Sequence, residues 1–473
     1  MKIGLINCIL EKIVNNLFKK IPKIDIFVND NAFANLNKEL LTNIAREEID
    51  KLRQRIKDKA LKDFDIEDLK NSIKNKYKKI TLPSLKPLIN ATGVILHTNL
   101  GRSPISQEIL QKAGEIITSY SNLEYNQKEG KRGERYSHVA KDLQTLLGVE
   151  SALVVNNNAS AVFLILNTFA KDKEVVVSRG ELVEIGGSFR VPEVMKASGA
   201  ILKEVGTTNK TKLSDYKNAI LDNTSMLLKV HKSNFDIVGF SEDVSFEEIS
   251  RLAKAHNLID YYDLGSAYIP ELPYNLGQKE PPLKKILKSN PSLVSFSGDK
   301  LFGSVQAGII IGKKEYIDKL KQNQLLRMLR VDKVTLSILQ ESIRAYIFKE
   351  YEKIPTLKLL FTDTKTLKTR AENIKQTLKN NICEVVESKT YMGGGTLPNR
   401  TFPTVALAFK GNAVELEKKF RSYNLIGRIE NDRFLIDFRS ILPELDKEVI
   451  KIAESLGLRA TYNKAVSCFA KKL

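Results

Sequence analysis

Between residues 89 and 345 the sequence alternates short, continuous apolar runs with stretches of helical periodicity. The runs consist mainly of Val, Ile and Leu and lack a regular polar alternation, which is typical of buried strands in a parallel sheet. Because a helical stretch separates most successive strands, we expect a doubly wound α/β domain with a largely parallel sheet. The expected strands are SALVV, EVVV, AILKEV, SMLLKV, LIDYYDL, LVSF and AGIIIG.

Residues 1–88 form a smaller, basic unit before this core, with 19 Lys and Arg residues against 12 Asp and Glu. Apolar residues at three- and four-residue steps predict a helix over residues 38–60, and a second, shorter helix is expected over 64–77. The segment offers few apolar residues for a core of its own. It ends in KKITLPSLKP, where two prolines indicate a linker.

Residues 346–473 are predicted to form a small α+β unit after the core. Helical patterns lie near residues 363–380 and 445–457. The expected strands of this unit are ICEVVES, TVALAF and RFLIDF.

The chain of 473 residues has 75 Lys and Arg against 56 Asp and Glu, a formal net charge of +19. This excess fits a polyanionic partner such as nucleic acid, although abundant Lys from low-GC codon usage has the same effect. The three cysteines are scattered, and no HExxH string occurs, so neither a disulfide framework nor a metal site is expected. The N-terminal apolar stretch is interrupted by charges, and no run reaches the ~18 residues of a membrane span. We therefore expect a cytoplasmic protein without a membrane partner.

Residues of distinct chemistry follow three of the expected strands. Lys300 comes after LVSF in the string SGDK, and Asp263 closes LIDYYD. A phosphate can be held where a helix begins, by free N–H groups and the helix dipole. The four residues that follow SALVV and open an apolar helix are Asn157, Asn158, Ala159 and Ser160.

This order of residues matches what pyridoxal 5'-phosphate requires of a protein. A lysine amine can bond covalently to the cofactor's aldehyde. A carboxylate such as that of Asp263 keeps the ring nitrogen protonated, so that the ring can accept electrons. The helix terminus at residues 157–160 is the expected phosphate site, with Ser297 as a further phosphate ligand.

Other interpretations of the lysine stay open at this point. Ser297 and Lys300 also form the SxxK pattern of serine acyl-enzymes, but the SDN and KTG strings that accompany it are absent. A lysine after a strand is often an ordinary surface group. The string GIIIGKK lacks the spacing of a Walker A motif, so an ATP-driven reaction is not supported.

Longer strings extend the pattern through the core and into the C-terminal unit. They are INATGVILHTNLGRSP, YSNLEYNQKEGKRGERYSHV, VNNNASAV, SRGELVEIGGSFRVPEVM, VHKSNFDIVGF, YYDLGSA, SFSGDKLFGSVQAGII, LLRMLRVDK, GGGTLPNRTFP and RFLIDFRSILPE. Together these strings resemble bacterial selenocysteine synthase, the family of L-seryl-tRNA(Sec) selenium transferases. The resemblance implies a fold-type-I pyridoxal phosphate enzyme with a mostly parallel seven-stranded sheet, a helical N-terminal domain and an α+β C-terminal domain.

The resemblance also implies a reaction on serine attached to tRNA(Sec). Loss of the α-proton and the β-hydroxyl gives an aminoacrylyl intermediate, and selenium from selenophosphate then adds to give selenocysteinyl-tRNA(Sec). Lys300 is the expected cofactor lysine and the base for the α-proton. Asp299 is a candidate for proton transfer or for orienting a neighbouring residue, with helix capping as the alternative. His231, Ser233 and Asn234 are candidates for cofactor contacts, with a structural role in the loop as the alternative.

The resemblance places Arg102, Arg327 and Arg330 near the selenophosphate anion, in a site shared between neighbouring subunits. Guanidinium groups suit such an anion, and Arg327 and Arg330 share a face if LLRMLR is helical. Surface salt bridges are the alternative. The string RGER at residues 132–135 is interpreted as a solvated charge cluster, with a subunit or cofactor contact as the alternative.

The expected partners are tRNA(Sec), bound by residues 1–88, and further copies of the chain in a decamer built from dimers; DNA is not an expected partner. A pair of oligomerisation helices is the alternative for the N-terminal unit. Two other functions remain: a pyridoxal phosphate lyase acting on a small amino acid or amino sugar acid, and a non-catalytic RNA-binding scaffold. The N-terminal extension argues against the lyase, and uptake of the cofactor would argue against the scaffold.

Overall fold

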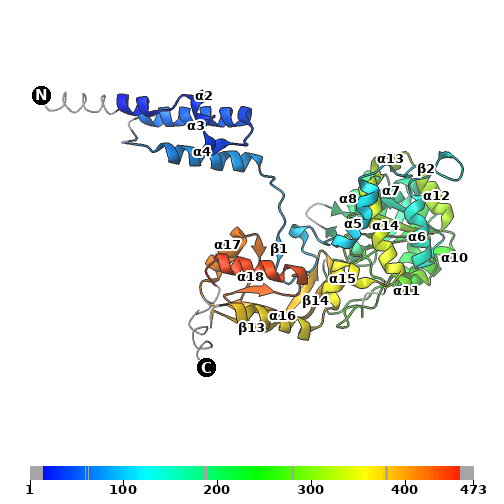
Figure 1. The fold of residues 1–473 in the computed structure, drawn as a ribbon. Coiled ribbons are helices and arrows are strands. Elements are labelled where there is room, and N and C mark those ends of the chain that lie inside the picture. Colours follow the sequence, from blue (N-terminus) through cyan, green and yellow to red (C-terminus); the bar gives the residue numbers. More distant parts are fainter. Residues whose placement is uncertain are drawn as a thin grey trace. The chain divides into compact units, whose positions relative to one another are not determined.

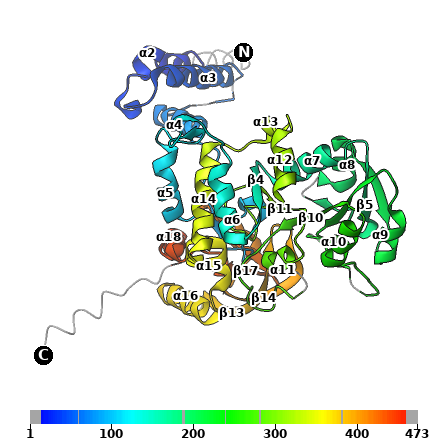
Figure 2. The ribbon, with the colours of Figure 1, turned by 90° about the vertical axis from the view of Figure 1, so that its right-hand side faces the viewer.

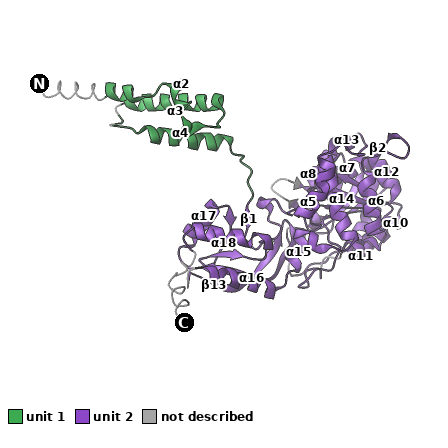
Figure 3. Ribbon diagram, viewed as in Figure 1, with its two compact units in different colours: residues 1–87 green, residues 88–473 purple. Residues whose placement is uncertain are grey.

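The computed structural model describes residues 14–58, 60–61, 63–185, 189–233, 235–237, 239–278, 282–378 and 382–458. The chain divides into two compact units, residues 1–87 and residues 88–473 (Figure 3). The division falls within the proline-containing segment where the linker is expected. The predicted core and the predicted C-terminal unit lie together in the second of these units.

The first unit has a small apolar core of its own. Its helices are α2 (Ile24–Phe27), α3 (Lys38–Lys57) and α4 (Ile66–Thr81). The side chains of Asn37 and Asp65 cap α3 and α4 by accepting hydrogen bonds from backbone N–H groups of the first turn. The buried cluster consists of Phe27, Val28, Phe33, Leu41, Ile44, Ala45 and Ile73. The expectation that this segment has few apolar residues for a core is therefore wrong, because α2 and the 3-10 turn before α3 supply Phe27 and Phe33, which the helical pattern did not reveal.

A seven-stranded sheet forms the centre of the second unit, which confirms the expected α/β class. The strand order is β4-β12-β11-β10-β9-β5-β8. Each strand coincides with one of the predicted apolar runs. Their bounds are β4 (Ser151–Val155), β5 (Glu174–Ser178), β8 (Ile201–Val205), β9 (Thr224–Val230), β10 (Ile259–Ser266), β11 (Leu293–Ser297) and β12 (Gly308–Gly312).

One strand of the sheet, β12, runs against its neighbours. It pairs antiparallel with both β11 and β4, whereas β11, β10, β9, β5 and β8 pair parallel with one another. The chain returns from β11 to β12 through a turn with no crossover helix, and such a connection joins only antiparallel strands. Consequently β4, β10 and β11 present their carboxyl ends at the same edge.

Helices surround this sheet (Figures 1 and 2). Among them α14 packs against α5 and α6, and the three lie next to one another in Figure 2. The helices are α5 (Gln107–Ile117), α6 (Ser137–Leu147), α7 (Asn158–Phe169), α8 (Val191–Ser198), α9 (Leu213–Ala219), α10 (Phe246–Ala255), α11 (Leu283–Leu287), α12 (Lys314–Gln322), α13 (Leu326–Leu329), α14 (Lys333–Ile347) and α15 (Pro355–Phe361). They bury the apolar sheet on both faces, as strands without polar alternation require.

The C-terminal part is an antiparallel sheet with helices, as predicted. Its strand order is β13-β14-β17-β16, and the first strand of the second unit, β1 (Ile89–Asn90), pairs with β15 (Leu425–Ile426) beside it. The strands are β13 (Cys383–Gly393), β14 (Thr396–Phe409), β16 (Arg428–Glu430) and β17 (Arg433–Asp437), and the helices are α16 (Thr364–Thr377), α17 (Ala413–Ser422) and α18 (Asp446–Ser455). Short strand pairs complete the unit: β2 (Tyr125–Asn126) with β3 (Lys131–Arg132), and β6 (Glu184–Ile185) with β7 (Phe189–Arg190).

Within the described ranges, no helix combines the length and the apolar character needed to cross a bilayer.

Candidate active site

The residues predicted to carry chemistry lie at the shared carboxyl edge of β4, β10 and β11. Residues 157–160 follow β4, Asp263 lies in the last part of β10, and Lys300 follows β11. In open α/β sheets, ligands bind at this edge. The parallel direction of these strands therefore gathers residues that are distant in sequence.

Lys300 lies in a tight turn and is 6% exposed. Its carbonyl accepts a hydrogen bond from the Gly303 N–H at 2.8 Å, and the Gly298 carbonyl accepts one from the Ser304 N–H at 2.8 Å. Burial lowers the pKa of the Lys300 amine, and the positive charge of Arg102 lowers it further, against the opposing effect of Asp263 and Asp299. The site thus favours the neutral, nucleophilic form of the amine more than water does.

Asp263 is buried next to this lysine, with 4% of its surface exposed. Its Oδ1 accepts hydrogen bonds from the Asn158 side-chain amide at 2.8 Å and from the Gly265 N–H at 3.2 Å. Its backbone carbonyl accepts one from the His231 N–H at 2.9 Å, which brings His231 to the carboxylate. Burial raises the pKa of Asp263, whereas the Asn158 hydrogen bond and the charge of Lys300 lower it.

The expected phosphate site is the beginning of α7. Asn157 caps this helix, and its Oδ1 accepts a hydrogen bond from the Ser160 N–H at 2.8 Å. The cap therefore occupies one of the N–H groups that the sequence pattern left free for a phosphate. Ala159 lies exposed in the first turn, and Ser297 ends β11 opposite Gly308.

Gly308 allows β12 to lie close to the beginning of α7. A Cβ atom at this position would lie 2.1 Å from the backbone oxygen of Asn157. Only a residue without a side chain lets β12 approach the start of α7 this closely. Because Gly308 also pairs with Ser297, one strand holds the helix terminus and the lysine turn together.

The three expected anion-binding arginines lie in two places. Arg102 donates a hydrogen bond to Asp299 Oδ2 at 2.7 Å, beside Lys300. Arg327 and Arg330 line a pocket of about 370 Å³ instead. The condition that they share a helical face is wrong, because α13 ends at Leu329 and Arg330 has an extended backbone with φ −69° and ψ 143°.

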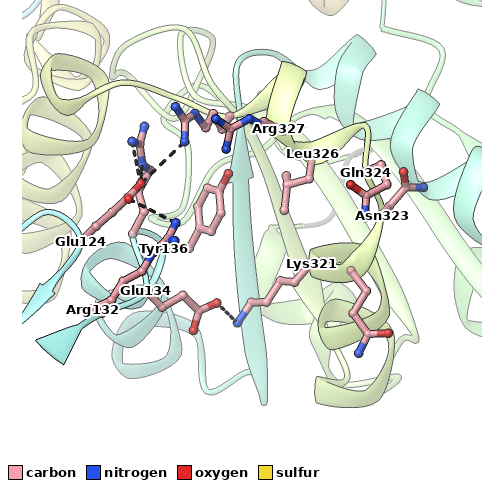
Figure 4. Close-up of a pocket in the computed structure, with 13 residues that line it drawn as sticks. Glu124, Arg132, Glu134, Tyr136, Lys321, Asn323, Gln324, Leu326 and Arg327 are labelled. Atoms are coloured by element: carbon pink, nitrogen blue, oxygen red, sulfur yellow. Dashed lines mark hydrogen bonds and ion pairs between the residues drawn. The ribbon is translucent and has the colours of Figure 1, made fainter.

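Charged side chains surround that pocket, which we call the arginine pocket (Figure 4). Arg135 is largely buried and donates to Glu124 Oε1 at 2.9 Å, so the RGER string is not only a solvated cluster. Lys321 pairs with Glu134 at 2.7 Å. The ionisable residues of the arginine pocket are Arg132, Arg135, Arg327, Arg330, Lys321, Glu124, Glu134 and Tyr136. Cations outnumber carboxylates, which gives the pocket a positive charge.

The side chains at the sheet edge fit pyridoxal phosphate. Asn158 Oδ1 and Ser233 Oγ are buried and have no hydrogen-bond partner in the described part of the chain. Buried polar atoms are rarely left unpaired, so such atoms around a buried lysine indicate space for a polar ligand. No cluster of three or more potential metal ligands occurs among the described residues.

Comparison with known proteins decides between the remaining interpretations. Residues 88–442 match the SelA family, described as L-seryl-tRNA selenium transferase. A protein of that name from Aliarcobacter butzleri is 57% identical over 447 residues, covering 93% of this chain and 99% of its own length. One from Nautilia profundicola is 55% identical, covering 96% and 99%.

The chain belongs to the L-seryl-tRNA selenium transferase family. Family membership favours a selenium transferase over a small-molecule lyase. Among solved structures, that of D-glucosaminate-6-phosphate ammonia-lyase is similar, with a TM-score of 0.55 at 19% sequence identity, covering 81% of this chain and 99% of that one. This likeness concerns the fold alone, which is that of fold-type-I pyridoxal phosphate enzymes.

One predicted residue of the candidate site cannot be described, and one segment of the site was missed in the sequence. Asn234 lies outside the described residues. Ser233, a candidate for a cofactor contact in the sequence, is fully buried near Lys300. The turn at residues 393–395, which approaches Lys300 from the C-terminal sheet, was missed. Its run of three glycines was the signal in the sequence that could have found it.

Proposed function

We propose that this protein converts seryl-tRNA(Sec) to selenocysteinyl-tRNA(Sec), with selenophosphate as the selenium donor. The observation that carries the proposal is the 57% identity with a selenium transferase over 93% of the chain. The buried Lys300 beside Asp263, at the edge where such folds bind ligands, agrees with that activity.

Pyridoxal 5'-phosphate is the cofactor. When bound, it supplies an electron sink that stabilises negative charge at the substrate's α carbon. Lys300 would hold its aldehyde carbon, and Asp263 its ring nitrogen. Asn158, Ala159, Ser160 and Ser297 would surround its phosphate, and Asn157 would act through the cap of α7. His231, whose backbone N–H is hydrogen-bonded to the Asp263 carbonyl, is the candidate for a further contact with the cofactor.

Lys300 is also the candidate base for the α-proton of the seryl group. Because burial lowers its pKa, the neutral form of the Lys300 amine, which can take a proton, is more accessible than that of a lysine in water. Asp299 holds Arg102 by an ion pair at 2.7 Å, so we assign Asp299 a role in positioning that guanidinium and in raising the proton affinity of Lys300.

The arginine pocket is the proposed entry site of the donor anion. Among the described residues no ion-pair partner is recorded for Arg327, which leaves its guanidinium available to an oxyanion. The ion pair recorded for Arg330 within the described ranges is a long one, 3.7 Å, to Glu124. Arg102 would receive the anion at Lys300.

We assign binding of tRNA(Sec) to residues 1–88. Along α3, Lys51 and Arg53 pair with nearby carboxylates, whereas no ion pair is recorded for the exposed Arg55 and Lys57 within the described residues. Unpaired cations on a helix are suited to phosphate contacts. We further propose a cytoplasmic homo-oligomer, a decamer by resemblance.

The test is incubation of the purified protein with seryl-tRNA(Sec), selenophosphate and pyridoxal phosphate, followed by identification of the esterified amino acid. We expect selenocysteine, and unchanged serine with the Lys300→Ala variant. Unchanged serine with the cofactor-loaded parent protein would contradict the proposal.

A further inference from the structure

Ser233 carries a buried hydroxyl group that makes no hydrogen bond to the described residues. Its exposed fraction is 0%, and its Oγ has no hydrogen-bond partner in the described part of the chain. A buried hydroxyl without a partner loses its hydration and gains nothing in return. Such a group in a binding site indicates a ligand atom that completes the hydrogen bond.

Three chain segments meet at this hydroxyl. A Cβ atom at Gly395 would lie 3.9 Å from Ser233 Oγ and equally 3.9 Å from Lys300 Nζ. A Cβ atom at Gly265 would lie 3.9 Å from the Cβ of Ser233. The two glycines therefore leave open a small space whose polar borders include the Ser233 hydroxyl and the Lys300 amine.

We propose that Ser233 is a further catalytic residue, which binds the β-hydroxyl of the substrate's seryl group and gives it a proton as it leaves as water. The inference rests on the proposed function, because it requires a seryl substrate. The proposal is based on the position of the two residues. A substrate group bound between them would have the Lys300 amine, a base, on one side and the Ser233 hydroxyl, a proton donor, on the other.

The proton transfers balance within these two residues. Lys300 takes the α-proton, and the electron pair of the Cα–H bond enters the new Cα–Cβ double bond. The Cβ–O bond breaks with its electron pair on oxygen, and this oxygen takes the proton of Ser233 Oγ. Ser233 regains a proton from the Lys300 ammonium group, so the seryl group loses one water and the enzyme is unchanged.

Asp299 and Asp263 are less suited to this transfer. Asp299 is already bound to Arg102, and Asp263 accepts hydrogen bonds from Asn158 and Gly265. Both carboxylates are therefore already engaged by other groups of the chain. Ser233 is a neutral donor in the same region.

The experiment compares Ser233→Ala with Ser198→Ala in the cofactor-loaded full chain. Ser198 is a matched control, because it is equally buried but its hydroxyl donates to the Met195 carbonyl at 2.7 Å. Two rates are measured on seryl-tRNA(Sec) without selenophosphate: exchange of the α-proton with deuterated water, and loss of the β-hydroxyl. The thermal unfolding midpoint of each variant before cofactor loading is a third readout.

We expect Ser233→Ala to slow loss of the hydroxyl by about 10²-fold or more while exchange of the α-proton stays within about threefold. Its unfolding midpoint should equal or exceed that of the parent, since the deleted hydroxyl has no partner, whereas Ser198→Ala should lower the midpoint. Ser233→Cys keeps a weak donor and should recover part of the rate.

Equal loss of both rates in Ser233→Ala, or a lowered unfolding midpoint, would show a structural role and overturn the inference. An unchanged rate of hydroxyl loss would overturn it as well. A parent protein that neither exchanges the α-proton nor releases the hydroxyl would instead contradict the proposed function, so the two failures are distinguishable.

Discussion

Burial acts in opposite directions on the two central ionisable residues, because it disfavours whichever form is charged. It lowers the pKa of Lys300 and raises that of Asp263. Their mutual attraction opposes both shifts. Arg102 and Asp299 add a second pair of charges beside the lysine, so its proton affinity depends on four residues from three segments of the chain.

This dependence predicts the effect of removing the Arg102 charge. In Arg102→Gln, repulsion of the Lys300 ammonium is lost and Asp299 is freed from its ion pair, so the pKa of Lys300 should rise. Coupling of the cofactor requires the neutral amine, and its midpoint in a pH titration, followed by visible absorbance, should therefore move to higher pH. Arg344→Gln, at an exposed pair with Glu341, should leave the midpoint unchanged. A downward shift for Arg102→Gln would contradict this account.

At the scale of elements, the site depends on how α7 begins. The helix starts where the chain leaves β4, and Asn157 satisfies the Ser160 N–H there. The close approach of Gly308 fixes the same residue from the other side. The proposed phosphate site is thus a helix terminus held by a side-chain cap and by a neighbouring strand.

Removing the cap should affect both stability and the cofactor. Asn157→Ala is expected to lower the free energy of unfolding by about 1 kcal/mol and to weaken retention of pyridoxal phosphate. Asn412→Ala is the matched control, because Asn412 caps α17 by accepting hydrogen bonds from the Val414 and Glu415 N–H groups. The control should show a similar loss in urea unfolding with full cofactor retention. Equal cofactor loss in both variants would argue against a phosphate site at α7.

At the scale of the whole molecule, the chain combines a compact basic unit with a separate unit that holds the lysine site. Residues 1–87 have their own apolar cluster, and the site residues all belong to residues 88–473. A division of labour between tRNA binding and chemistry is consistent with this organisation.

Deletion of residues 1–87 should therefore separate tRNA binding from cofactor binding. The remaining chain is expected to take up pyridoxal phosphate but to lose most of its affinity for tRNA(Sec), measured by filter binding. Binding by the full chain should weaken steeply with added salt, because it rests on phosphate contacts. Unchanged tRNA affinity of the shortened chain would assign the contact to the second unit.

Much of the fold and several residues of the site could be predicted from the sequence. The strands were visible because each is a short apolar run, and burial on both faces of a sheet demands that composition. Lys300, Asp263 and the start of α7 were visible because each directly follows or ends such a run. These patterns are local in the sequence, so they can be recognised without knowing which segments pack against them in the fold.

Other features were decided only by tertiary structure, because they depend on distances between segments remote in sequence. The apolar pattern of β12 does not indicate whether the strand runs parallel or antiparallel to its neighbours. That direction is seen only in its pairing with β11 and β4. Arg327 and Arg330 lie in one pocket although only Arg327 is helical. The space between Ser233 and Lys300 exists because Gly395, which is 95 residues after Lys300 and 162 after Ser233, has no side chain to fill it. Such a space depends on how side chains pack in the folded chain. Packing brings together residues that are far apart in the sequence, so no local sequence pattern reveals it.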